Sequence, residues 1–222
     1  MAKIKPFEEY TIRYEDWFER NKWVYRSELQ AIRIQLPEKG EGVEIGVGTG
    51  RFAAPLGIKH GVEPSAKMRE IAKQGGIDAS DGEAEKLPFD DSRFDYLLMV
   101  TTICFLDDIL GSFKEAYRVI RPGGCIIIGF IDSSSPPGKK YLQHKNESVF
   151  YKPATFFSPG EVASLLETAG FTGLHFSQTI FHDTAEIRGL EPVKKGCGEG
   201  SFVVVKAKKE SQSMEPATKC SK

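Results

Sequence analysis

The sequence predicts an α/β protein with a doubly wound, mostly parallel sheet, preceded by an added helical segment. Between residues 43 and 131, short apolar runs alternate with helical patterns, which is typical of parallel strands joined by covering helices. The first apolar run leads directly into glycines, and two further β-runs close the pattern. Residues 7–36, in contrast, follow a helical period alone.

The composition indicates one domain with additions, since the chain has 222 residues and domains commonly hold about 150. A net charge of −1 offers no bulk attraction to nucleic acid or to an anionic membrane. No run approaches the roughly 18 apolar residues of a membrane span, and residues 1–10 lack the apolar core of a signal peptide. We therefore expect a soluble, cytoplasmic protein with no nucleic-acid or membrane partner.

Residues 1–37 are predicted to form a helical cap. Its aromatic residues recur at spacings of three, four and seven, with charged residues between them: Phe7, Tyr10, Tyr14, Trp17, Phe18 and Tyr25. Asn21 is expected to interrupt the helical segment, and Pro37 to end it.

Residues 38–207 are predicted to form the main domain. The expected parallel strands are residues 43–47, 61–63, 77–79, 94–100 and 125–131, and the clearest helices are residues 65–73 and 107–120. Asp107 or Asp108 can cap the second of these helices. Further along, Ser158 and Glu161 have the spacing of a capping box that begins another helix.

The end of the chain is predicted to add two more strands. The β-runs at residues 171–180 and 202–206 suit an antiparallel hairpin with residues 181–200 inserted between them. Residues 132–157 form another long excursion, and we expect both inserted segments on the substrate side of the sheet. Residues 208–222 are polar and are expected to be a disordered tail.

The first chemical signal is the series Gly46, Gly48 and Gly50 directly after the first strand. Glycines at alternate positions let the backbone turn tightly and approach a ligand at the carboxyl end of the strand. A dinucleotide site uses the spacing G-x-G-x-x-G, but here the third glycine comes one position early. A phosphate-binding Walker loop is also absent, because no Gly-Lys-Ser/Thr follows.

Two acidic segments follow on the next strands. Glu63 ends the second strand, where a carboxylate can accept hydrogen bonds from both hydroxyls of a ribose. After the third strand, Glu83 can accept from an adenine amino group while the Ala84 amide donates to a ring nitrogen. Taken singly, each segment could equally be an ordinary solvated acidic loop.

In this order on successive strands, the three segments resemble the class I S-adenosylmethionine-dependent methyltransferases. The resemblance extends through Phe94-Asp95-Tyr96 and residues 115–124, and onward to residues 158–171. It implies a Rossmann-like, seven-stranded sheet whose last strand is antiparallel to the others. It also implies S-adenosyl-L-methionine as cofactor and S-adenosyl-L-homocysteine as product.

The resemblance assigns cofactor roles residue by residue. The glycines would pack against the methionine portion and ribose, Glu44 would orient their loop, and Glu63 would hold the ribose. Pro64 or Met68 would touch the adenine, and Glu83 with Ala84 would read its edge. The full expected set is Glu44, Gly46, Gly48, Gly50, Glu63, Pro64, Met68, Gly82, Glu83, Ala84 and Thr101. Two departures are that Glu83 stands where Asp is commoner and that residues 51–59 are short for the usual first helix.

The acceptor is predicted to be a small molecule, as in the branch that includes quinone-biosynthesis methyltransferases. Motifs of DNA-base methyltransferases are absent, and Phe105 stands where relatives often carry His, so no catalytic base can be named. An amine or an aromatic hydroxyl is therefore the expected acceptor. The methylated atom and the oligomeric state are not indicated by the sequence.

Aromatic residues of the added segments are the candidates for the acceptor pocket: Tyr10, Tyr14, Trp17, Phe150 and Tyr151. The alternative is that they are core residues that pack the helical cap against the sheet. Two other functions also fit the motifs less well, a non-catalytic S-adenosylmethionine-binding protein and a nicotinamide-dependent oxidoreductase. No metal is expected, because the Cys and His residues lack ligand spacing.

Overall fold

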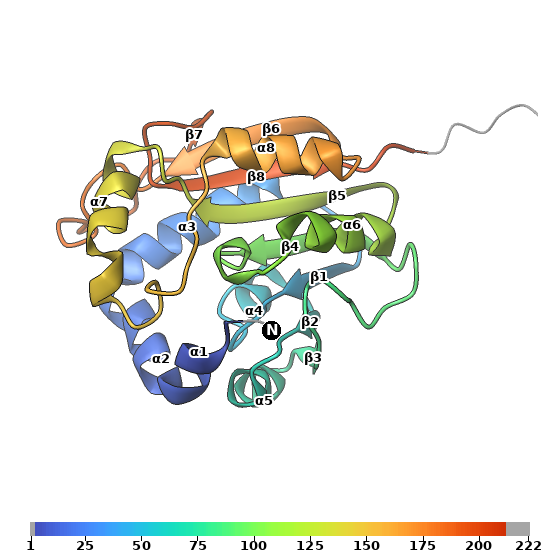
Figure 1. The fold of residues 1–222 in the computed structure, drawn as a ribbon, viewed down its shortest axis with the longest axis horizontal. Helices are drawn as coiled ribbons and strands as arrows, with labels where there is room; N and C mark the ends of the chain where they lie inside the picture. The colour runs from blue at the N-terminus through green and yellow to red at the C-terminus, as the bar shows by residue number, and fades with distance from the viewer. Residues whose placement is uncertain (1–2, 212–222) are drawn as a thin grey trace, which may run out of the picture.

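The computed structural model describes residues 3–211 and contains one eight-stranded sheet in the order β3-β2-β1-β4-β5-β8-β6-β7 (Figure 1). The strands are β1 Gly42–Ile45, β2 His60–Val62, β3 Asp78–Ser80, β4 Phe94–Val100, β5 Ile120–Ile131, β6 Thr172–Thr179, β7 Lys194–Lys195 and β8 Phe202–Lys208. Strands β1 to β5 pair in parallel, whereas β8 runs antiparallel to both β5 and β6. The predicted α/β class and the closing hairpin are therefore confirmed.

The sheet has one strand more than the resemblance implied. The additional strand is β7, two residues long, which pairs with β6 through Ser177 and Lys195. It lies within the inserted segment 181–200 and forms the edge of the sheet beyond β6.

Helices cover both faces of the sheet (Figure 1). They are α1 Lys5–Glu9, α2 Thr11–Arg20, α3 Lys22–Gln35, α4 Ala53–Leu56, α5 Ala66–Gln74, α6 Ile109–Val119, α7 Pro136–His144 and α8 Pro159–Thr168, with 3-10 turns η1 Ile103–Phe105 and η2 Lys145–Glu147. Along β4, Leu97 and Met99 pack in the core beneath α6 and α8, whereas Leu98 and Val100 pack in the core beneath α3 and α4. This alternation follows from the two-residue period of a strand.

The helix boundaries follow the capping signals. Asp108 accepts a hydrogen bond from the Gly111 amide at 2.9 Å, and Ser158 with Glu161 forms the capping box that begins α8. Asn21 separates α2 from α3, as expected. A break that the periodicity did not indicate lies at Tyr10, where α1 ends and α2 begins.

Part of the segment predicted to be a disordered tail, residues 208–222, belongs to the folded structure. Lys208 is the last residue of β8, and the Lys209 ammonium donates to the carbonyls of Tyr117 and Ile120, each at 2.7 Å. These bonds extend the ordered structure past the expected boundary at residue 208. The rest of the predicted tail, residues 212–222, lies outside the described residues.

Candidate active site

The loops that follow β1, β2, β3 and β4 meet at the carboxyl edge of the sheet and line one pocket. Nine of the eleven residues expected to contact cofactor lie in this lining: Gly46, Gly48, Glu63, Pro64, Met68, Gly82, Glu83, Ala84 and Thr101. Lys3, Ile4 and Phe7 close the pocket from the N-terminal segment. Glu44 and Gly50 do not line it. We call this the cofactor pocket.

The glycine loop has a backbone that side chains would disturb. Gly46 and Gly48 have φ values of +70° and +56°, in the left-handed region that favours glycine. A Cβ on Gly48 would lie 3.2 Å from the Tyr14 hydroxyl, so the loop and α2 approach closely here. Gly50 faces the other way, toward Ile77 and Ala72, and serves packing against α5.

Glu63 links the glycine loop to the start of α5. One carboxylate oxygen accepts from the Gly48 amide and the other from the Ser65 amide, both at 2.9 Å. Burial raises the pKa of Glu63, while these two backbone bonds act in the opposite direction. A carboxylate has about four acceptor positions, and Glu63 lines the pocket. The residue therefore fits a ribose, because each oxygen keeps a lone pair for a hydroxyl.

Glu44 is buried beneath the loop, with 1% of its surface exposed. It accepts a hydrogen bond from the Ala53 amide, and burial holds its pKa well above the ordinary value. Its Oε2 has no hydrogen-bond partner among the described residues. Glu44 is thus placed to support the turn into α4, and its contact with cofactor remains a prediction.

A second, larger pocket of about 580 Å³ adjoins the first. Its walls come from distant parts of the chain: α1 to α3, Phe52, the turn after β4 with Thr101 and Phe105, the end of β5 with the excursion that follows it, and Thr184 of the second insertion. Tyr14, Trp17, Phe150 and Tyr151 line it, as four of the five predicted acceptor residues. The fifth, Tyr10, lies outside, because it occupies the break between α1 and α2 and is 42% exposed. We call this the acceptor pocket.

Four residues line both pockets and form the junction between them: Phe7, Tyr14, Thr101 and Phe105. The rings of Phe7 and Phe105 are 5.0 Å apart in an edge-to-face arrangement, and Phe150 lies 5.4 Å from Phe7. Thr101 has a φ of +50°, unusual for a β-branched residue, where β4 turns into η1. The junction is therefore apolar except for two hydroxyl groups.

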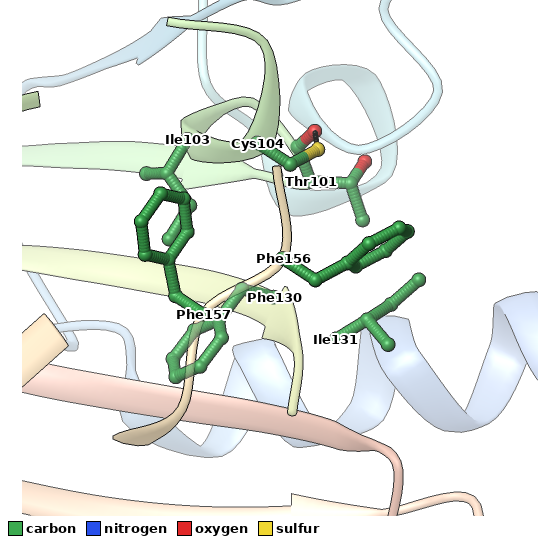
Figure 2. Close-up of a pocket in the computed structure, with 7 residues that line it drawn as sticks. All are labelled: Thr101, Ile103, Cys104, Phe130, Ile131, Phe156 and Phe157. Carbon is green, nitrogen blue, oxygen red and sulfur yellow. Dashed lines mark hydrogen bonds between the residues drawn. The ribbon is translucent and has the colours of Figure 1, made fainter. Parts of the chain in front are cut away.

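Thr101 is supported from below by tightly packed aromatic residues. Figure 2 shows Phe156 directed toward Thr101 and Ile131, while Phe157 and Phe130 lie on the other side, near Ile103. The space that they enclose is about 10 Å³, no larger than one water molecule needs. It is a packing gap and not a ligand site.

The junction contains no obvious proton acceptor. Burial raises the pKa of Tyr14 far above its ordinary value, so its hydroxyl stays protonated near neutral pH. Burial also raises the pKa of the Cys104 thiol to about 12, and this thiol donates to the Thr101 carbonyl. Phe105 presents only a ring. These side chains can position an acceptor and exclude water from it.

Glu28 lines the acceptor pocket and was missed by the sequence analysis. It lies on the buried face of α3, between Val24 and Ile32, at helical spacing. A carboxylate in the middle of an apolar stripe is the signal that would have identified it, because such residues are seldom buried without a purpose. Burial raises the pKa of Glu28 to about 8.

A group of polar contacts, which we call the clasp, connects the N-terminal helices to the glycine loop. The Arg51 guanidinium donates to both Glu15 and Glu19, and the Thr49 hydroxyl also donates to Glu15. On α1, the backbone carbonyl of Glu8 accepts from the Lys67 ammonium at 2.8 Å. These contacts hold one wall of the acceptor pocket on the cofactor loops.

Within residues 3–211 no helix is both long and apolar enough to cross a bilayer. In the same range, no three His, Cys, Asp or Glu side chains are grouped so that they could hold a metal ion.

Comparison with known proteins agrees with this geometry. Residues 43–128 match the family model described as a methyltransferase domain. A crystal structure from Thermotoga maritima, described as an S-adenosylmethionine-dependent methyltransferase and "possible histamine N-methyltransferase", is 50% identical, with a TM-score of 0.90 over 92% of this chain and 98% of that chain. An uncharacterized protein of Methanocaldococcus jannaschii is 44% identical over 93% of this chain and its own full length. A demethylmenaquinone methyltransferase of Staphylococcus aureus is 26% identical, covering 69% of this chain and 76% of its own.

The fold and the pocket at its strand ends therefore define a methyltransferase. This chain belongs to the class I S-adenosylmethionine-dependent methyltransferases, and S-adenosyl-L-methionine is its cofactor. The non-catalytic and nicotinamide-dependent alternatives are set aside by this membership.

Proposed function

We propose that the enzyme methylates a small molecule, with an amine nitrogen as the preferred acceptor atom and an aromatic hydroxyl as the second candidate. The observation that carries this proposal is the acceptor pocket, which opens onto the cofactor pocket at the junction. Its volume of about 580 Å³ lies within the usual range for small-molecule sites. The description of the 50% identical relative as a possible histamine N-methyltransferase supports an amine.

The cofactor supplies an electrophilic methyl group on a sulfonium centre. Phe7 and Phe105 keep water from the junction, and the Tyr14 and Thr101 hydroxyls can orient a polar acceptor there. Holding two reactants in line at near contact can account for much of a barrier reduction. A neutral amine is already nucleophilic, so the lack of a base at the junction is compatible with transfer to nitrogen.

We also propose that the enzyme acts in the cytoplasm, and that its acceptor is a metabolite and not a nucleic acid. The acceptor pocket is enclosed by aromatic side chains, and the net charge of −1 gives no attraction for a polyanion.

Turnover tests this proposal directly. Labelled S-adenosyl-L-methionine is incubated with a panel of primary amines, imidazoles and phenols, and formation of S-adenosyl-L-homocysteine is measured. We expect turnover with at least one amine. Binding of S-adenosyl-L-homocysteine without turnover by any member of the panel would contradict a small amine or phenol as acceptor.

Two tryptophan variants then locate the acceptor. Trp17→Ala removes an acceptor-pocket wall, whereas Trp23→Ala changes a half-buried tryptophan that lies outside both pockets. Trp17→Ala should raise the KM for the acceptor and leave the Kd for S-adenosyl-L-homocysteine unchanged. Trp23→Ala should leave both constants near the wild-type values.

A further inference from the structure

Glu28 presents an uncompensated acidic group to the acceptor pocket. The residue is 9% exposed and lines the pocket from α3. Among residues 3–211, no hydrogen bond or ion pair links its carboxylate to another group, and burial alone raises its pKa. A buried carboxyl group without a partner is destabilising, because the loss of its hydration is not compensated. A ligand that supplies the partner would remove this penalty.

The walls around Glu28 are aromatic. Burial raises the pKa values of Tyr141 of α7 and Tyr151 after η2, and the charge of the nearby Glu28 adds to both shifts. Both rings line the same pocket, and Trp17 adds a third aromatic face. A carboxylate among aromatic faces is an arrangement that suits an organic cation, because the charge and the ring faces both attract it.

The basic residues of the pocket are engaged elsewhere or exposed. The Lys145 ammonium donates to the Ala154 carbonyl at 2.8 Å, and the Arg20 guanidinium donates to the Asp16 carbonyl. Arg13 and His144 are exposed. None of these cations forms an ion pair with Glu28, and Glu147, the other acid of the pocket, is itself exposed and contacts His144.

Glu28 does not line the cofactor pocket, so it is separate from the junction where methyl transfer takes place. We propose that Glu28 is the specificity-determining residue of the acceptor pocket: it binds a cationic group of the acceptor, while a second nucleophilic atom of the same molecule lies at the junction. The acceptor is thus a small, bifunctional organic cation. This inference rests on the proposed function and assigns its substrate class.

Three matched probes test the inference: tyramine, 4-hydroxyphenethyl alcohol and 4-hydroxyphenylacetate. They share a phenol ring and end in an ammonium, a hydroxyl and a carboxylate. Their Kd values are measured by calorimetry on the full chain saturated with S-adenosyl-L-homocysteine. Wild type should bind the ammonium probe most tightly. Glu28→Gln should weaken that probe by about tenfold or more, and should change the Kd of the neutral probe little.

The pH dependence distinguishes a binding role from a structural one. Glu28 must be ionised to hold a cation, so the Kd of tyramine should fall as pH rises toward about 8, by up to about tenfold per unit. The other titratable and charged groups that share the pocket of Glu28 are Arg13, Tyr14, Arg20, Tyr141, His144, Lys145, Glu147 and Tyr151. Glu28→Gln should abolish the dependence. If His144 caused it, the dependence would remain in Glu28→Gln.

The control is Asp16→Asn, which removes an exposed acid on α2 outside both pockets. It should bind all three probes as wild type does. Equal tyramine affinity in wild type and Glu28→Gln, or tightest binding of the carboxylate probe, would overturn the inference. Turnover with an uncharged acceptor would then leave the methyltransferase function standing. Unchanged affinity of Glu28→Gln for S-adenosyl-L-homocysteine shows that the variant is folded.

Discussion

The cofactor pocket and the acceptor pocket share one edge of the sheet but are assembled in different ways. Most of the cofactor pocket comes from short loops that each follow a strand directly, so its residues are close to one another in sequence and topology. Most of the acceptor pocket joins α1 to α3 with residues 131–151 and Thr184, which lie more than 100 residues beyond Glu28 in the sequence. A sequence motif can describe the first kind of site, whereas the second combines aromatic residues that the sequence indicated with contacts that only the tertiary structure reveals.

The largest expected effect is a loss of affinity in the cofactor pocket. Glu63→Ala should weaken S-adenosyl-L-homocysteine binding by about 1.5–3 kcal/mol, because charged hydrogen bonds to ribose are lost. The variant should also melt earlier, since the Gly48 and Ser65 amides lose their acceptors. Calorimetry measures the first effect and thermal unfolding the second. Asp81→Ala, at an exposed acid nearby, is the control. Unaltered affinity in Glu63→Ala would contradict a ribose-binding role.

The second prediction concerns the acceptor pocket and the way in which Glu28 makes the stability of the protein depend on pH. The folded-state pKa of Glu28 is raised to about 8 from 4.5, so the folded state holds a proton that the unfolded state has released. The stability that this proton contributes is present below about pH 4.5 and is lost as pH rises toward 8. Glu28→Gln should match wild type near pH 4 and become increasingly more stable than wild type as pH rises, with most of the difference arising between about pH 4.5 and 8.

Urea unfolding of both proteins across this pH range measures the difference. Glu44 and Glu63 also have raised pKa values, so both proteins should lose stability with rising pH. Only the gap between the two curves reports on Glu28. A constant gap would show that folding does not change the pKa of Glu28.

A smaller loss of stability is expected when either of two glycines is replaced by alanine. Gly48→Ala and Gly57→Ala both place a side chain at positive φ, which is destabilising by about 1–2 kcal/mol. A Cβ at Gly57 meets no atom within 4 Å, whereas at Gly48 it lies between Tyr14 and Met68. Both variants should lose similar stability in denaturant titrations, but Gly48→Ala alone should bind S-adenosyl-L-homocysteine more weakly. Equal binding by the two variants would mean that the loop tolerates a methyl group.

The smallest effect concerns the clasp, the contacts of Arg51 and Thr49 that connect the N-terminal helices to the glycine loop. Arg51→Lys keeps the charge but loses the forked contacts with Glu15, and should reduce stability by about 0.5–1 kcal/mol. Arg93→Lys does the same to a forked pair with Glu41 that lies away from both pockets. Steady-state kinetics should show a higher acceptor KM for Arg51→Lys only. A similar KM in both variants would mean that the clasp does not shape the acceptor pocket.

The parts of the fold that sequence predicted best are those with local causes. Helix capping at Asp108 and Ser158 and the strand expected at residues 94–100 depend on neighbouring residues, and the structure agrees with these predictions. Strand β7 was not predicted, because two lysines carry no hydrophobic pattern and pair only where β6 offers an edge. The Lys209 contacts depend likewise on carbonyls about 90 residues earlier.

The residues of the candidate site also divide into those that local sequence could predict and those that depend on distant parts of the chain. Nine expected cofactor residues lie in one pocket because each is held at a strand end. Tyr10 and Trp17 looked equivalent by helical spacing, yet a break at Tyr10 turns it to the surface while Trp17 lines the acceptor pocket. Glu28 could not be assigned a role from sequence, because α7 and the residues after η2 that enclose it are more than 100 residues away.

The junction also bears on how this enzyme could acquire a new substrate over evolutionary time. Four of the twenty residues that line the acceptor pocket also line the cofactor pocket. Replacements among the remaining positions can alter the shape and charge presented to the acceptor while the inherited nucleoside site stays intact. At Phe7, Tyr14, Thr101 and Phe105, by contrast, any change alters both sites at once. Descendants that diverge in substrate should therefore vary first in the cap and excursion, and last at these four positions.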